Sequence, residues 1–137
     1  MFSHDFKNIS TEEILSHINS NGYFSFDNAL SKEFIKNIIN DVNKEGVNLN
    51  ANNISGVYYS PANQFFLTHM MSVSKTFYNF CTDDILINIC SKFFKEDFRI
   101  KTFRYYENYG GQKMQWHTDN RTVERKTNSK GLIILVY

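Results

Sequence analysis

The end of the sequence, Gly131–Tyr137, constrains the fold most strongly, because every residue after the glycine is apolar. Such a run is typical of a β-strand that is covered on both faces. The strands expected before it, at 97–106, 114–118 and 23–26, are too few to cover it. We therefore expect residues 1–137 to be the N-terminal part of a single domain that continues beyond Tyr137.

The composition indicates a folded protein with an aromatic core. Thirteen Phe, eight Tyr and one Trp are more than a disordered chain carries, and 137 residues suffice for one domain. The 15 basic and 14 acidic residues nearly cancel, so we expect no role in binding nucleic acid. No segment reaches the roughly 18 apolar residues that a membrane span requires.

The N-terminus and the cysteines favour a cytoplasmic location. Met1–Lys7 contains no basic region followed by an apolar stretch, and therefore does not look like a signal peptide. Cys81 and Cys90 have neither CxxC spacing nor a neighbouring His, so we predict that both are buried thiols.

Helical spacing of apolar residues precedes the strands. The predicted helices cover residues 11–21, 32–46, 64–80 and 83–94. Ser10 and Glu13 fit a capping box at the start of the first helix, and Ser31 fits the N-cap of the second. The second helix carries an apolar stripe of Phe34, Ile35, Ile38, Ile39 and Val42. Between the second and third helices, residues 47–63 are predicted to form a long loop.

The predicted strand at 97–106 has mixed faces. Because side chains alternate along a strand, Arg104 and Tyr106 should lie on one side. Phe103 and Tyr105 should lie on the other.

His117 and Asp119 are the candidate metal ligands. Two residues apart on a strand, they point to the same face. Ferrous iron in mononuclear oxygenases is held by two His and one carboxylate, so this pair supplies two of the three ligands. Alone, the pair also fits a surface His and a turn Asp. We expect structural or solvent roles for the other histidines, which are His4, His17 and His69.

Several motifs around this pair follow one another in a familiar order. They are Gly22-Tyr23-Phe24, Ala29-Leu30-Ser31, Arg104-Tyr105-Tyr106, Gly110-Gly111, Trp116-His117-Thr118-Asp119-Asn120 and the final apolar run. This order resembles the phytanoyl-CoA dioxygenase family over nearly the whole chain, and the Trp-His-x-Asp-Asn segment is its most specific part. The later motifs are also similar to those of prolyl hydroxylases, which belong to the same superfamily.

The resemblance implies an α+β fold in which N-terminal helices pack on a double-stranded β-helix, the cupin-like jelly roll. This chain would hold only the first strands of that jelly roll. The implied activity is that of a non-haem Fe(II)- and 2-oxoglutarate-dependent dioxygenase. Such an enzyme uses O2 to hydroxylate a small organic or lipid-like substrate and releases succinate and CO2.

The resemblance also assigns roles to individual residues. His117 and Asp119 would bind iron, whereas no residue of this sequence matches the family's distal His or the basic residue that binds 2-oxoglutarate. Tyr106 would donate a hydrogen bond to a cosubstrate carboxylate, and Arg104 would pair with that carboxylate or with an acidic substrate. A packed aromatic ring and a solvated Arg are equally open readings of these two residues. Asn120 would orient Asp119 or cap the turn.

Three alternatives to this function remain open at the level of sequence. One is a prolyl-hydroxylase-like oxygenase that acts on a protein or an amino acid. Another is a catalytically inactive jelly-roll protein that uses its pocket for binding. The third is a zinc or nickel site, which is disfavoured because Glu124 is the only further ligand nearby.

Overall fold

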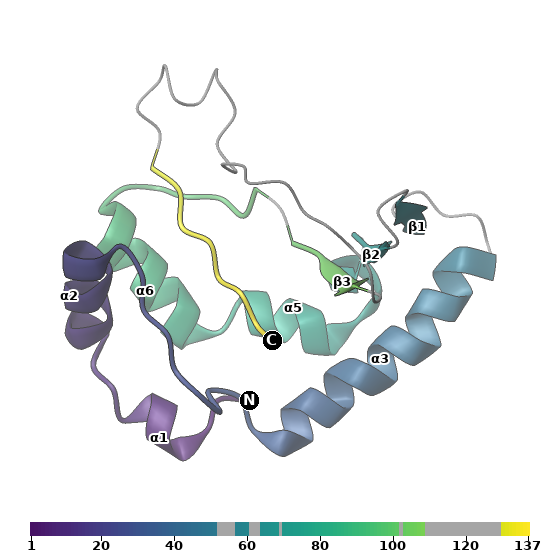
Figure 1. Ribbon diagram of the computed structural model, residues 1–137, viewed down its shortest axis with the longest axis horizontal. Helices are drawn as coiled ribbons and strands as arrows, with labels where there is room; N and C mark the ends of the chain where they lie inside the picture. Colours follow the sequence, from purple (N-terminus) through teal and green to yellow (C-terminus); the bar gives the residue numbers. More distant parts are fainter. Residues whose placement is uncertain (52–56, 61–63, 69, 102, 109–129) are drawn as a thin grey trace.

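The computed structural model describes residues 1–51, 57–60, 64–68, 70–101, 103–108 and 130–137. This part of the chain combines helices with a small antiparallel sheet (Figure 1). In chain order the elements are α1 (His4–Lys7), α2 (Thr11–Asn21), α3 (Lys32–Ala51), β1 (Val57–Ser60), β2 (Gln64–Leu67), α4 (Met70–Val73), α5 (Lys75–Cys81), α6 (Asp84–Phe94) and β3 (Tyr105–Asn108).

The sheet and one helix pair lie at opposite ends of the molecule. Helix α2 packs against α6, whereas α3 packs against α4, α5 and β1. In Figure 1, α2 and α6 form one end, the sheet lies at the other end beside α3, and α5 lies between them. The helices therefore cover one side of the sheet and continue well past it.

Two neighbouring clusters form the core and confirm the predicted aromatic interior. The first contains the buried residues Phe2, Phe6, Ile14, Leu30, Phe34, Phe80, Cys81, Leu86 and Ile89. The second contains Val42, Leu67, Met70 and Phe77. Ile38 and Phe103 pack against both clusters and so join them. Cys81 is buried as predicted, and Cys90 is half-buried.

Helices α2 and α6 confirm the sequence predictions for these segments. The Ser10 hydroxyl accepts a hydrogen bond from the Glu13 amide at 3.1 Å and begins α2. Gly22 ends this helix with a φ of 81°, a left-handed conformation that a side chain disfavours. The Asp83 carboxylate begins α6 by accepting from the Ile85 amide at 2.9 Å.

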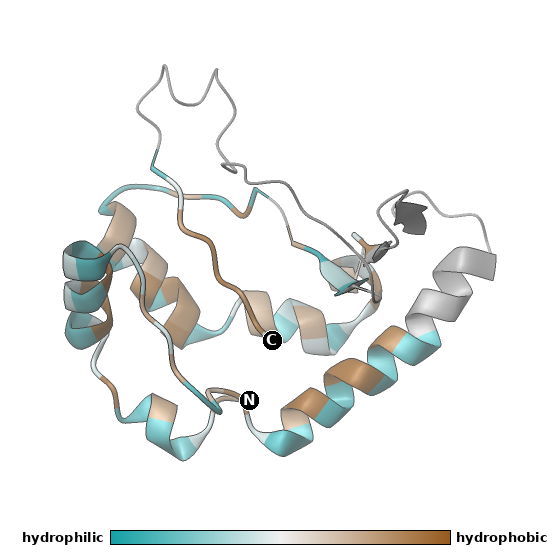
Figure 2. Cartoon of the chain, in the orientation of Figure 1, coloured by the Kyte–Doolittle hydropathy of each residue, from teal (hydrophilic) through white to brown (hydrophobic). Residues whose placement is uncertain are grey.

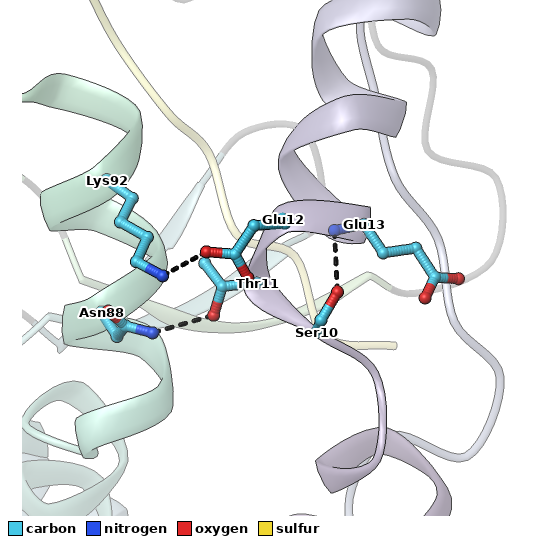
Figure 3. A network of polar contacts seen from close by, with 6 residues as sticks. All are labelled: Ser10, Thr11, Glu12, Glu13, Asn88 and Lys92. Atoms are coloured by element: carbon cyan, nitrogen blue, oxygen red, sulfur yellow. Dashed lines mark hydrogen bonds and ion pairs between the residues drawn. The ribbon is translucent and has the colours of Figure 1, made fainter.

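Polar contacts join the two helices along their exposed side (Figure 3). The Asn88 amide donates to the Thr11 hydroxyl at 2.8 Å, and the Lys92 ammonium donates to the Glu12 carboxylate. The hydrogen bond from Lys92 lowers the pKa of Glu12 below its ordinary value. Because these groups are exposed, the contacts add little to stability.

Helix α3 differs from its prediction in length and in burial. It passes through Gly46, where we expected it to end, and continues to Ala51. Since a glycine inside a helix costs only about 1 kcal/mol, the longer helix tolerates it. Within the predicted stripe, Phe34 and Val42 are buried, but Ile35 and Ile39 are 43% and 49% exposed. The described residues therefore cover only part of the apolar stripe on α3, and Ile35 and Ile39 stay exposed.

The segment predicted as one helix over 64–80 is divided between three elements. Gln64–Leu67 forms β2, which pairs with β1 and β3 in the order β1-β2-β3. A short apolar run fits both a strand and a helix, and pairing with β1 on one side and β3 on the other decides between them here. Part of the predicted loop at 47–63 likewise belongs to α3 and β1.

The predicted strand at 23–26 is also wrong. These residues have no strand pairing, and the rings of this segment pack on other rings instead. Phe26 lies edge-on to Phe6 at a centroid distance of 5.4 Å, and Phe24 stacks with Phe26 at 6.5 Å.

Two further predictions of strands differ from the structure, because one strand begins later than expected and the other segment is not a strand. The strand expected at 97–106 begins at Tyr105, because Phe98 stacks on Phe94 at 5.7 Å and stays beside α6. The apolar run Gly131–Tyr137, brown in Figure 2, forms no strand. Leu132 packs against the first core cluster, but the residues after it are 46% to 101% exposed. The predicted cover on both faces is not supplied by the described part of the chain.

Candidate functional site

The predicted iron ligands lie outside the described residues. This applies to His117 and Asp119, and also to Asn120 and Trp116. The described residues of the predicted site are Arg104 and Tyr106, so the geometry of the candidate site is the geometry of β3 and the residues before it.

One face of β3 packs on the helices. Phe103 lies edge-on to Phe77 at a centroid distance of 5.6 Å. Tyr105 packs against the second core cluster and is the cross-strand partner of Leu67, which is fully buried. Phe103 and Tyr105 therefore share the helix-covered side, as the alternation in the sequence predicted.

The two candidate binding residues are Tyr106 on β3 and Arg104 directly before the strand. Arg104 is exposed, and Tyr106 retains 38% of its accessible surface. The register pairs Tyr106 with Phe66 of β2. Since side chains alternate along a strand, the Tyr106 side chain leaves the sheet on the side opposite to Tyr105, which packs against the second core cluster. A phenol hydroxyl and a guanidinium on one open face can together bind a carboxylate.

Sequence reasoning missed a polar contact on the helix-covered side. The Tyr105 hydroxyl donates a hydrogen bond to Glu107 Oε1 at 2.8 Å, and both side chains are partly buried. The two residues lie on either side of Tyr106 in the chain. Their spacing of two on a strand was the available signal, because it places both side chains on one face.

The described histidines have local partners. His4 Nδ1 is 3.1 Å from the side-chain nitrogen Nδ2 of Asn8, and His17 Nδ1 is 3.3 Å from Nδ2 of Asn21. Within the described ranges, no three His, Cys, Asp or Glu side chains are grouped closely enough to hold a metal ion. His69 is not among the described residues.

Two shallow hollows on the described surface lie elsewhere. One, of about 480 Å³, is bordered by α1, α2 and α6, and the other, of about 440 Å³, by the N-terminus, α3 and α5. Neither is lined by Arg104 or Tyr106. The candidate binding face is therefore an open sheet surface rather than part of these hollows.

Among the described residues, no helix is both long and apolar enough to cross a membrane. Comparisons of the chain with protein-family models, curated proteins and solved structures find no match.

Proposed function

We propose that this protein is an Fe(II)- and 2-oxoglutarate-dependent dioxygenase, similar to phytanoyl-CoA dioxygenases, that hydroxylates a small organic or lipid-like substrate. The observation that carries the proposal is the division of β3 into two faces. Phe103 and Tyr105 pack against the helices, whereas Tyr106 on β3 and Arg104 directly before it are exposed.

This division is the one that the proposed jelly roll requires. In that fold the helices cover the outside of one sheet, and the cosubstrate lies between this sheet and a second one. The face of β3 that turns away from the helices would then line the pocket. A Tyr hydroxyl and an Arg guanidinium on that face suit the two carboxylates of 2-oxoglutarate.

The donor set of His117 and Asp119 suits ferrous iron. An imidazole nitrogen and a carboxylate oxygen are two of the three ligands used by mononuclear non-haem oxygenases. Asn120 follows directly and would hold the Asp119 carboxylate in place by a hydrogen bond. When bound, iron and 2-oxoglutarate would supply the chemistry that activates O2 and leaves succinate and CO2.

The protein's own residues would bind and orient the cosubstrate. Tyr106 and Arg104 would hold the cosubstrate in one orientation. Because Asp119 stands where a halogenase would have a small residue, we propose hydroxylation as the outcome.

The test uses the intact protein without oxygen, supplied with Fe(II) and 2-oxoglutarate. Bidentate binding of 2-oxoglutarate to iron should give a visible charge-transfer band, and His117→Ala should abolish it because an iron ligand is lost. His17→Ala is the matched control, since His17 is exposed on α2 and bonded locally to Asn21.

Two results would contradict the proposal. An unchanged band in His117→Ala would reject the ligand assignment. No band in the unaltered protein would reject the oxygenase and favour a jelly-roll protein that only binds its ligand.

A further inference from the structure

The hydrogen bond between Tyr105 and Glu107 joins the residues that flank Tyr106. It lies on the helix-covered face, where Tyr105 packs against the second core cluster. The donor is a ring fixed by packing, so the acceptor carboxylate of Glu107 is held relative to the core. We call these two side chains the β3 pair.

The β3 pair restrains the backbone at Tyr106. Side chains two residues apart share one face of a strand when the intervening residue is extended, so their hydrogen bond favours that conformation. The register supports the same conformation, since Tyr105, Tyr106 and Glu107 are opposite Leu67, Phe66 and Phe65 of β2. The β3 pair and the pairing with β2 therefore both keep the backbone extended at Tyr106, and this fixes the side of the sheet on which the Tyr106 side chain lies.

We propose that Tyr105 and Glu107 are positioning residues that hold Tyr106 toward the bound cosubstrate. This inference rests on the proposed function, because it assigns the pair a role in binding 2-oxoglutarate. Neither side chain would touch the cosubstrate, because both lie on the helix-covered face. The hydrogen bond from Tyr105 to Glu107 restrains the backbone between them, and the restrained backbone orients the Tyr106 hydroxyl.

The experiment is a double-mutant cycle on 2-oxoglutarate affinity, measured anaerobically by titrating the charge-transfer band of the intact protein. Tyr106→Phe removes a hydrogen bond to a carboxylate and should weaken binding about tenfold or more. Tyr105→Phe keeps the ring in the core and removes only the donor, and it should weaken binding about threefold. The double variant should bind 2-oxoglutarate like Tyr106→Phe alone, because once the Tyr106 hydroxyl is gone the Tyr105 hydroxyl has nothing to position.

Two matched variants complete the design. Glu107→Gln keeps an acceptor oxygen, so the affinity of this variant for 2-oxoglutarate should stay close to that of the unaltered protein. Tyr78→Phe changes a tyrosine on α5 that is 52% exposed, and it should have no effect on 2-oxoglutarate binding. A thermal melt of each variant separates loss of positioning from loss of folding.

The outcomes distinguish this inference from the proposed function. Normal binding in Tyr105→Phe, or losses that add fully in the double variant, would overturn the positioning role and leave the oxygenase intact. Absence of 2-oxoglutarate binding in the unaltered protein would overturn both.

Discussion

At the scale of single residues, side-chain oxygens decide where the helices begin. Each N-cap oxygen accepts a hydrogen bond from a backbone amide in the first turn, which would otherwise have no partner. The described caps are Ser3, Ser10, Ser31, Ser74 and Asp83. Ser74 differs from the others because it also donates to another helix, through a hydrogen bond to Asp41 Oδ2 at 2.5 Å. One buried hydroxyl thus begins α5 and ties it to α3.

We predict that Ser74→Ala destabilises the protein by about 1–3 kcal/mol, because it removes a cap and leaves a partly buried carboxylate without its donor. The free energy of unfolding, measured in urea, tests this. Ser72→Ala is the matched control, since Ser72 is exposed on α4, and it should leave the free energy nearly unchanged. Equal values for the two variants would contradict the role assigned to Ser74.

At the scale of elements, α6 shows how an amphipathic helix acquires its stability. Leu86 and Ile89 are buried in the first core cluster, whereas Ile87 faces outward and is 38% exposed. The polar contacts of α6 with α2 lie on exposed side chains. Burial of the apolar side should therefore contribute most of the stability of this helix.

We predict that Ile89→Ala costs roughly 2–5 kcal/mol, because the substitution leaves a cavity in the core. Ile87→Ala on the same helix should cost about 1 kcal/mol or less, since much of its surface is already in water. Chemical denaturation of both variants is the measurement. A larger loss for Ile87→Ala would mean that the outward side of α6 is covered in solution.

At the scale of the whole molecule, a titratable group in the core links global stability to pH. Burial raises the pKa of Cys81 from its ordinary value of 9.0 to about 11. The unfolded chain therefore loses the thiol proton at a lower pH than the folded protein does. The contribution of the Cys81 thiol to the free energy of unfolding is fully present below the pKa of the unfolded chain. It is lost as the pH rises from that pKa to the pKa of the folded protein.

We predict that the free energy of unfolding falls less steeply over this alkaline range in Cys81→Ala than in the unaltered protein. Near about pH 7 the thiol is protonated in both states, so a comparison there isolates the packing cost of the substitution. Denaturation at a series of pH values measures both effects. Parallel pH profiles would show that Cys81 is accessible to water in the folded protein.

The candidate site was predicted from the sequence only in part. Alternation alone separated Arg104 and Tyr106 from Phe103 and Tyr105, because the two-residue repeat of a strand is a local property. The hydrogen bond from Tyr105 to Glu107 was not predicted, since it requires the ring of Tyr105 to be fixed by a core built from distant segments. Which face is covered depends on the same distant segments.

By itself, the sequence determined where α2 and α6 begin, the aromatic character of the core and the residue types of the candidate iron site. The helix starts depend on neighbours within about four residues, which is the range of a helical turn. The aromatic character of the core follows from the composition. Only the tertiary structure decided that 64–67 is a strand, that 23–26 is not, and which face of β3 lies open. Strands take their hydrogen bonds from other segments of the chain, so their local pattern does not determine whether a strand forms or which of its faces is covered.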